Sequence, residues 1–92
     1  MIISENYLLK DIMDSSVLIP VGQYVAEHRS ILSLNETSAF ICKQLVNELT
    51  EDELLERMYF EYETENQEER DIIKGDVEIF LKEARQKGVI VD

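Results

Sequence analysis

Two hydrophobic periodicities divide the chain near residue 34. Before this point, short apolar runs rich in β-forming residues alternate with turn residues, a pattern typical of strands. The predicted strands cover residues 7–12, 16–21 and 29–34. A turn at residues 13–16 joins the first two into a hairpin, so we expect a three-stranded antiparallel meander.

Beyond residue 34, apolar residues recur about every 3.6 positions, which predicts helices. The three predicted helices cover residues 36–48, 51–62 and 67–87. Asn35 stands where the N-cap of the first helix belongs. Thr50 and Glu53 have the spacing of a capping box at the start of the second helix.

The third helix has the clearest boundaries. Asn66 is followed three residues later by Glu69, which favours a helix start, and Gly88 suits the left-handed conformation beyond a helix end. Its main apolar stripe, which we expect to face the core, comprises Ile73, Val77, Phe80, Leu81 and Ala84. Ile72 and Ile79 point about 100° or more away from the centre of this stripe, so the helix has a second apolar edge.

The other two predicted helices each have one apolar face. In the first helix this face comprises Ala39, Cys42, Leu45, Val46 and Leu49. In the second helix it comprises Leu54, Leu55, Met58, Tyr59 and Tyr62. Phe40 points away from the first of these faces, so it needs a contact elsewhere, either a partner surface or the N-terminal segment.

The length of 92 residues allows one hydrophobic core and is too short for two. We therefore predict a single α+β domain over residues 1–92. Its expected architecture is winged-helix-like, with a three-stranded antiparallel sheet followed by three helices.

The chain is strongly acidic, with 20 Asp and Glu against 9 Lys and Arg and a formal net charge of -11. This charge repels a phosphate backbone, and no basic patch offsets it. No apolar run approaches the roughly 20 residues that span a bilayer, and the N-terminal residues lack a secretory signal pattern. We therefore expect a cytoplasmic protein that binds neither nucleic acid nor membrane.

The sequence offers little catalytic or metal-binding chemistry. Cys42 belongs to an apolar stripe, and the one histidine, His28, lies in a predicted loop far from it in sequence. One cysteine and one histidine cannot supply a structural zinc site, and the three glycines form no phosphate-binding loop. The carboxylates are explained by helix starts and solvated faces. We predict that the protein is not an enzyme and holds no cofactor or metal.

Several segments dispersed along the chain together match the sequence pattern of a known family. They cover residues 7–12 and 17–22, residues 31–41, residues 49–54, and residues 76–77, 80–81, 84 and 88–90. In this order they resemble the PqqD-like family of RiPP recognition elements, which bind the precursor peptides of ribosomally made, post-translationally modified products. The junction Leu34-Asn35-Glu36-Thr37 is the most specific piece. The chain departs from the pattern at Cys42, where many members carry a large aromatic residue, and before Thr50, where glycine is frequent.

The resemblance implies that a leader peptide adds as a fourth strand beside residues 29–34 and lies against the third helix. The unpaired N–H and C=O groups of an edge strand make this binding mode physically reasonable. The predicted peptide-binding residues are Arg29, Ser30, Ile31, Leu32, Ser33, Ile72, Gly75, Asp76, Ile79 and Glu83. In the alternative interpretation none of these residues binds a peptide. The strand edge is then solvated, and Ile72 and Ile79 are scattered apolar surface residues. Gly75 is then a harmless bend in the helix, and Asp76 and Glu83 are solvated acids.

The predicted function is non-catalytic recognition of the leader segment of a precursor peptide, whose core is thereby presented to a separate modifying enzyme. The resemblance implies that this enzyme is a radical S-adenosylmethionine enzyme or a leader peptidase. Three alternatives stay open. They are a peptide chaperone of pyrroloquinoline quinone biosynthesis, an acidic winged-helix module for protein interaction or transcription, and a structural subunit of an enzyme complex.

Overall fold

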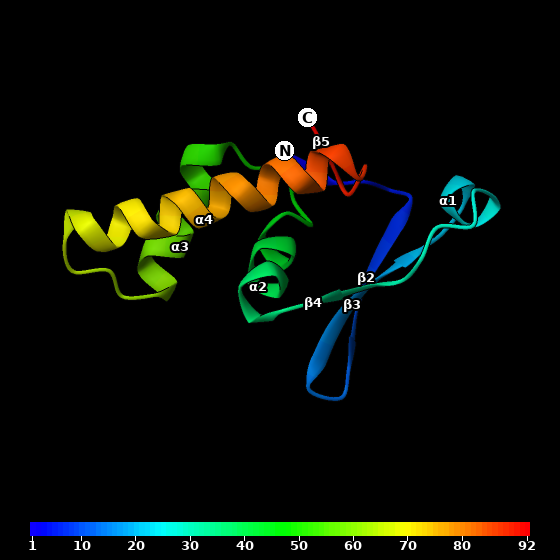
Figure 1. The fold of residues 1–92 in the computed structure, drawn as a ribbon, viewed down its shortest axis with the longest axis horizontal. Coiled ribbons are helices and arrows are strands. Elements are labelled where there is room, and N and C mark those ends of the chain that lie inside the picture. Colours follow the sequence, from blue (N-terminus) through cyan, green and yellow to red (C-terminus); the bar gives the residue numbers. More distant parts are fainter.

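The computed structural model describes all residues from Met1 to Asp92. In chain order its elements are β1 (Ile2–Ile3), β2 (Tyr7–Ile12), β3 (Ser15–Pro20), α1 (Gln23–Ala26), β4 (Leu32–Leu34), α2 (Glu36–Gln44), α3 (Glu51–Glu61), α4 (Gln67–Gln86) and β5 (Ile90–Val91). The molecule is elongated, measuring 45 × 30 × 19 Å. Figure 1 shows α3 and most of α4 toward one end, the larger sheet and α1 toward the other, and α2 between them.

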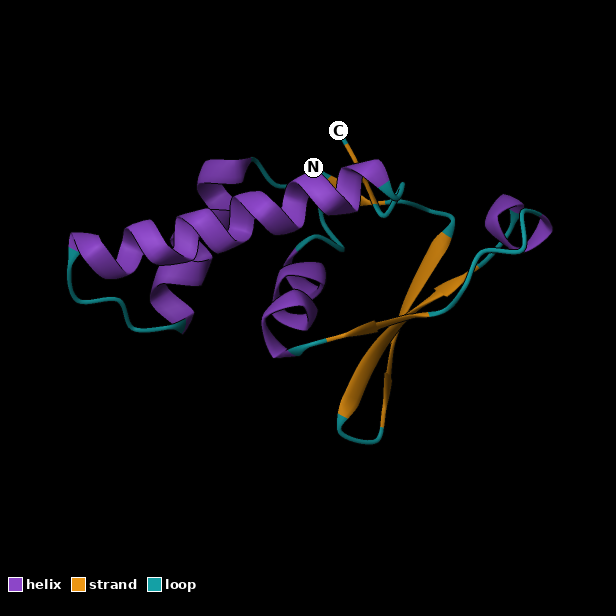
Figure 2. Cartoon of the chain, viewed as in Figure 1, coloured by secondary structure: helices purple, strands orange, loops and turns teal.

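The larger sheet is the three-stranded antiparallel sheet that the sequence predicts, with the order β2-β3-β4. Its hairpin register pairs Tyr7 with Pro20, and its second register pairs Leu18 with Leu32. The hairpin turn is tight and contains Met13, whose φ is 56°. Because β3 lies in the middle, β2 and β4 are both edge strands (Figure 2).

The strand β4 is shorter than the strand predicted over residues 29–34. The prediction was wrong for Arg29, Ser30 and Ile31, which precede the strand. Continuing the observed register would place Ser30 opposite Pro20, the last residue of β3. Proline has no N–H to donate to a neighbouring strand, so the ladder cannot continue normally there.

The structure has four helices where the sequence predicts three. The additional helix, α1, is a single turn of four residues in the segment predicted as a loop. It follows Gly22, whose φ of 56° is in the region that glycine adopts without strain. A single turn is too short to produce a recognisable helical periodicity, which explains why the pattern missed it.

The helix α2 ends earlier than the predicted boundary at residue 48. Val46, predicted to face the core, is 53% exposed. The backbone beyond α2 instead bonds to the start of the chain. The Ile3 N–H donates to the Leu45 carbonyl at 2.9 Å, and the Leu49 N–H donates to the Met1 carbonyl at 3.0 Å.

The two ends of the chain form a second, two-stranded sheet that the sequence pattern did not predict. Its antiparallel register pairs Ile2 with Val91 and Ile3 with Ile90. The N- and C-termini accordingly lie close together beside α4 (Figure 1). Two residues per strand give too little alternation for a strand signal.

The helix caps predicted from the sequence are confirmed. The Asn35 side chain accepts a hydrogen bond from the Ser38 N–H at 2.8 Å, and the Asn66 side chain accepts one from the Glu69 N–H at 2.9 Å. A complete capping box links Thr50 and Glu53. None of the helices combines the length and the apolar character needed to cross a membrane.

The core joins the sheet to the three longer helices. Its largest fully buried side chains are Leu18, Ile41, Leu45, Leu54, Met58, Leu81, Val77 and Cys42. Leu18 is the contribution of the central strand β3, whereas Val77 and Leu81 come from α4. This packing sets α4 alongside the β4 end of the sheet.

Candidate functional site

A groove of about 170 Å³ lies between β4 and α4. Its lining residues are Leu18, Leu32, Ser33, Leu34, Ser38, Phe80, Glu83, Ala84, Lys87 and Val89. Six of them are hydrophobic, so the floor is largely apolar. Two charged residues of opposite sign line the groove. Glu83 lies in the C-terminal part of α4, and Lys87 is the C-cap of this helix.

The edge of β4 beside this groove is unpaired. The strand bonds to β3 on one side, and no strand pairs with its other side. Leu32 and Leu34 share a face with buried Leu18 because side chains alternate along a strand and the register pairs Leu18 with Leu32. A strand added to β4 would therefore direct every second side chain toward the helical side of the sheet.

One end of the groove is held by side chains from the segment around α1. The Tyr24 hydroxyl donates to the Gly88 carbonyl at 3.2 Å, and the Arg29 guanidinium donates to the Lys87 carbonyl at 2.7 Å. The Arg29 guanidinium also stacks on the Tyr24 ring, 3.8 Å from its centroid. These contacts fix the residues before β4 against the end of α4, so they set the separation of the groove walls at this end.

The electrostatics of this contact favour a charged Arg29. A hydrogen bond to the Glu27 carboxylate, at 3.0 Å, raises the pKa of Arg29. The guanidinium also satisfies a carbonyl at the C-terminus of α4, where the helix dipole favours a cation. Arg29 therefore has a structural role at the groove end in addition to any contact with a ligand.

A smaller cavity of about 130 Å³ lies further along α4. Its lining residues are Thr37, Met58, Tyr62, Ile73 and Asp76. The Tyr62 hydroxyl and the Thr37 hydroxyl oxygen lie 3.5 Å apart. Thr37 is adjacent in sequence to Ser38 of the groove, so the two cavities follow one another along the line between α2 and α4.

The structure brings part of the predicted site together. Leu32, Ser33 and Glu83 line the groove, and Asp76 lines the smaller cavity. The prediction that they contact a peptide stays a prediction.

The other predicted residues lie around these cavities. Arg29 bonds to the end of α4, while Ser30 and Ile31 are exposed just before β4. Ile72 and Ile79 are exposed on α4 and line neither cavity. A Cβ built on Gly75 would meet nothing within 4 Å, so this glycine is not required by packing within the chain.

Sequence reasoning missed several residues that form these cavities. Phe80 is predicted only as a core residue and Lys87 is not among the predicted site residues, but both line the groove. Tyr24 lies in a segment taken for a loop, and no local signal ties it to Gly88. Tyr62 was predicted on a buried face and is 38% exposed, because it lies at the C-terminal cap of α3.

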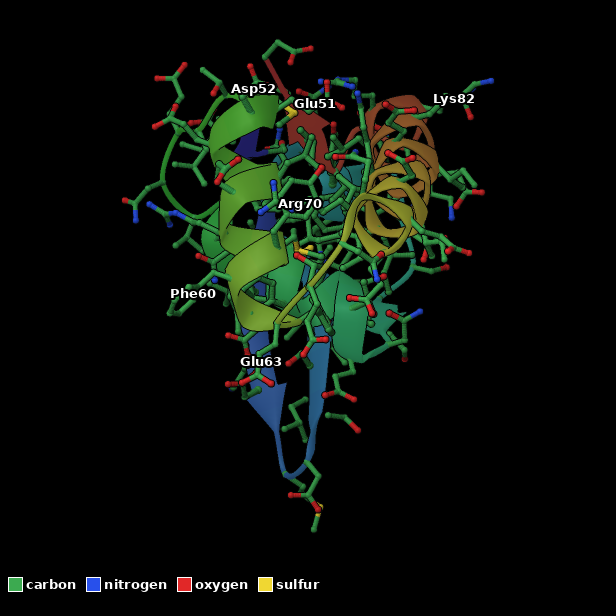
Figure 3. All side chains as sticks on the ribbon, turned by 90° about the vertical axis from the view of Figure 1, so that its left-hand side faces the viewer. Glu51, Asp52, Phe60, Glu63, Arg70 and Lys82 are labelled. Atoms are coloured by element: carbon green, nitrogen blue, oxygen red, sulfur yellow. The ribbon has the colours of Figure 1, made fainter.

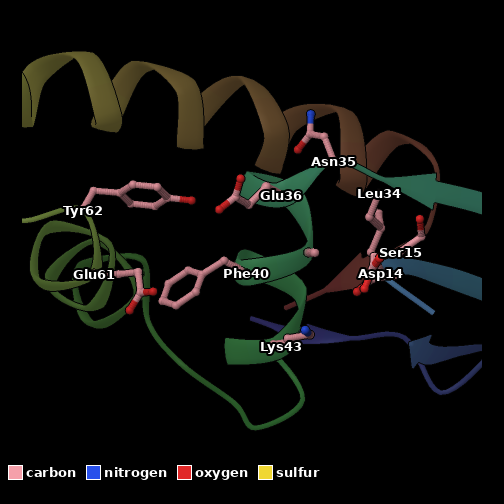
Figure 4. A pocket seen from close by; sticks show the side chains of 11 residues that line it. Asp14, Ser15, Leu34, Asn35, Glu36, Phe40, Lys43, Glu61 and Tyr62 are labelled. Atoms are coloured by element: carbon pink, nitrogen blue, oxygen red, sulfur yellow. The ribbon is translucent and has the colours of Figure 1, made fainter. Parts of the chain in front are cut away.

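A wider concavity of about 580 Å³ lies between the hairpin tip, α2 and the end of α3 (Figure 4). Phe40 points into the space between α2 and α3, where its ring meets Tyr62 edge to face at 6.1 Å. This contact is with the end of α3, which is neither of the two contacts that the sequence predicts for Phe40. Lys43 lies on another side of the concavity and is paired with Asp11 at 3.5 Å. The Ser16 hydroxyl in the lining donates to the Asp11 carboxylate at 2.6 Å, and neither Cys42 nor His28 lines the concavity.

Figure 3 shows Phe60 projecting from α3 into solvent near Glu63, on the side away from the body of α4. Phe60 is 85% exposed. Arg70, at the start of α4, lies over the Tyr59 ring at 5.0 Å. These side chains are separate from the groove between β4 and α4.

Cys42 is the one thiol of the chain and is fully buried. Burial raises the pKa of Cys42 to about 12, so its reactive thiolate form is scarce near neutral pH. His28 is exposed near α1 rather than beside Cys42. No group of three or more His, Cys, Asp and Glu side chains has the geometry to hold a metal ion.

Comparison with known proteins gives one family. A family model described as Coenzyme PQQ synthesis protein D (PqqD) matches residues 17–90. No curated protein and no solved structure matches the chain significantly. The matched range includes most of β3 and all of β4 and α4, and it contains every residue that lines the groove.

Proposed function

Since this chain belongs to the PqqD family, we propose that it recognises the leader segment of a ribosomally synthesised precursor peptide by strand addition. The peptide lies along the free edge of β4 and against α4. Its core segment remains outside the groove and is presented to a separate modifying enzyme. The single observation that carries this proposal is an unpaired strand edge beside an apolar groove.

Strand addition uses both features of the groove. The outward N–H and C=O groups of β4 offer main-chain hydrogen bonds of little sequence dependence. The apolar floor between Leu32, Leu34 and Phe80 accepts side chains from alternate positions of the peptide. Glu83 and Lys87 on the helical wall add charge selectivity.

The proposed role is tethering without catalysis. Members of the PqqD family act as non-catalytic accessory proteins, and the buried Cys42 offers no reactive nucleophile. Binding the leader raises the effective concentration of the modifiable segment at the enzyme if the intervening chain spans the distance. The partner enzyme proposed from the family is a radical S-adenosylmethionine enzyme, with a leader peptidase as the alternative.

A role in pyrroloquinoline quinone synthesis is the more specific candidate, and the description of the matching family model favours it. The identity of the bound precursor distinguishes this role from other peptide pathways. A transcriptional role has no comparable support. The helix α4 carries six acids between Glu68 and Glu83, namely Glu68, Glu69, Asp71, Asp76, Glu78 and Glu83, which oppose a phosphate backbone.

The proposal is tested by titrating fluorescently labelled candidate leader peptides and measuring anisotropy. Ile31→Asp and Ile79→Asp are suitable variants because each side chain is 61% exposed, so both proteins should fold. Each residue is next in sequence to a residue that lines the groove, Leu32 or Phe80, and we expect binding about tenfold weaker or worse. The matched control is Val46→Asp, which makes the same kind of change at an exposed residue outside the groove. If both variants fold and bind the leader unchanged, the placement of the groove is wrong.

Strand addition has its own signature. N-methylation of one peptide residue at a time removes one backbone donor, and donors facing β4 occur at every second residue. We therefore expect affinity to fall at alternate positions of the bound segment. Uniform tolerance of N-methylation would exclude main-chain pairing while leaving other modes of peptide binding open.

A further inference from the structure

The cavity formed by Thr37, Met58, Tyr62, Ile73 and Asp76 has an apolar interior and a charged rim. Met58 is fully buried and Ile73 is partly buried, and both contribute apolar surface. Asp76 supplies a carboxylate, and the hydroxyls of Thr37 and Tyr62 supply two further oxygen acceptors. An apolar wall that ends at an anionic rim suits a side chain with a hydrocarbon stem and a positive head.

Asp76 has no cation of its own in this chain. The three ion pairs of the structure join Arg29 to Glu27, Lys43 to Asp11 and Arg85 to Asp92. No side-chain hydrogen bond involves Asp76 either. A neutral apolar side chain placed here would remove water from this carboxylate without pairing it, and an acidic one would be repelled. Lysine or arginine is therefore the residue class that the cavity favours.

The distance from this cavity to the apolar groove matches the repeat of a strand. Asp76 and Phe80 are four residues apart on α4, which corresponds to about 6 Å along the helix axis. Two residues of an extended strand cover about 6.6 Å. Because alternate side chains of an added strand point toward α4, one peptide can place a cation at Asp76 and an apolar side chain at Phe80.

The direction of the peptide follows from the sheet. The chain runs from Leu32, which lines the groove together with Lys87, to Thr37, which lines the cavity together with Asp76. Both existing strand pairings of this sheet are antiparallel. A peptide added antiparallel to β4 therefore passes Asp76 first and Phe80 second.

We propose that the peptide bound beside β4 carries a lysine or arginine two residues before an apolar residue, with the cation in the Thr37–Tyr62–Asp76 cavity and the apolar side chain beside Phe80. This inference rests on the proposed strand addition and specifies which peptides it selects. The cation preference comes from the cavity at Asp76, and the apolar preference comes from the groove at Phe80.

The test is selection of a phage-displayed library of random short peptides on the whole protein, on Asp76→Arg and on Glu78→Arg. Wild-type protein should enrich peptides with Lys or Arg two positions before an aliphatic or aromatic residue. Asp76→Arg should replace this cation by Asp or Glu. Glu78→Arg, the same charge change at another exposed residue of α4 outside both cavities, should select the wild-type pattern. In a synthetic peptide of the selected sequence, replacing the cation by Gln should weaken binding to wild type about fivefold.

The outcomes separate the two proposals. Selected peptides that need Ile31 and Ile79 but show no cation preference, or keep it on Asp76→Arg, overturn the inference and leave strand addition intact. An apolar residue two positions before the cation overturns the proposed direction. A selection that enriches no peptide, or only peptides indifferent to Ile31→Asp and Ile79→Asp, overturns both the inference and the proposed function.

Discussion

Tyr24 and Gly88 are in contact although 64 residues separate them in the sequence. The Tyr24 hydroxyl donates to the Gly88 carbonyl at 3.2 Å, and a Cβ on Gly88 would lie 2.5 Å from the hydroxyl oxygen. Gly88 also has φ 72°, which a residue with a Cβ adopts at a cost. The closeness of this contact therefore depends on a glycine at the end of α4.

Gly88→Ala should destabilise the protein by about 2 kcal/mol, the sum of left-handed strain and a displaced hydrogen bond. The measurement is the free energy of unfolding from urea titration. Tyr24→Phe removes the obstructing oxygen and should cost about 1 kcal/mol by itself. The double variant should be more stable than the sum of the two costs predicts. If the two stability costs add strictly, the methyl group of Gly88→Ala does not clash with the Tyr24 hydroxyl.

Gly75→Ala should stabilise the protein by about 0.5–1 kcal/mol, because alanine favours a helix interior and the added Cβ meets no atom within 4 Å. The urea midpoint of unfolding measures this change. Leader-peptide affinity is the accompanying readout. Affinity that falls although stability rises would assign Gly75 to close contact with the peptide, whereas unchanged affinity would remove it from the predicted site.

Cys42 should resist alkylation in the folded protein. The thiol is fully buried, and burial raises the pKa of Cys42 to about 12. We expect iodoacetamide at pH 8 to label it only at the rate at which the protein opens, and rapidly in guanidinium chloride. Mass spectrometry over time gives both rates. Fast labelling of folded protein would show that the α2 side of the core opens readily.

The capping box at Thr50 should produce a pH-dependent contribution to stability. The Thr50 N–H donates to the Glu53 carboxylate at 3.0 Å, and this bond lowers the pKa of Glu53 from the usual 4.5. The folded pKa is thus below the unfolded one, so the stabilisation is complete above about pH 5 and is lost as the pH falls through the folded pKa. The difference in unfolding free energy between wild type and Glu53→Gln should therefore shrink on acidification.

The other acids titrate in both proteins, so their contribution to the pH dependence of the unfolding free energy cancels in the difference. In a chain of net charge -11 that contribution would otherwise dominate. Glu56→Gln on the same helix is the control for removing one carboxylate outside the capping box. A Glu53 difference that does not change between pH 3 and pH 6 would contradict a charge-dependent cap.

Local sequence was sufficient for several elements. The caps at Asn35, Thr50 and Asn66 depend on residues at most three positions away, and all three are present. The hairpin depends on two adjacent runs and one turn, and its strands lie within one residue of the predicted bounds. Interactions of this range can be read from the chain because their partners are fixed by covalent connection.

Other features depend on partners distant in sequence. The end of α2 is set by bonds from Ile3 and Met1 to the segment from Leu45 to Leu49, and β1 pairs with β5 across the whole chain. The short β4 reflects the place of Pro20 in the neighbouring strand. No local periodicity encodes such contacts, so the sequence pattern overextended α2 and β4 and missed the small sheet.

For the candidate site, the sequence alone determined which segments carry the chemistry: a strand before Leu34, an amphipathic α4 with an acidic and apolar flank, and a mostly anionic surface. Only the tertiary structure decided that Leu32 and Phe80 share one groove, that Asp76 lies in a neighbouring cavity with Thr37 and Tyr62, and that Tyr24 and Arg29 hold one end. The physical reason is that periodicity fixes the direction of a side chain within its own element, whereas the distance between two elements is fixed by packing and hydrogen bonds between residues that the sequence keeps far apart.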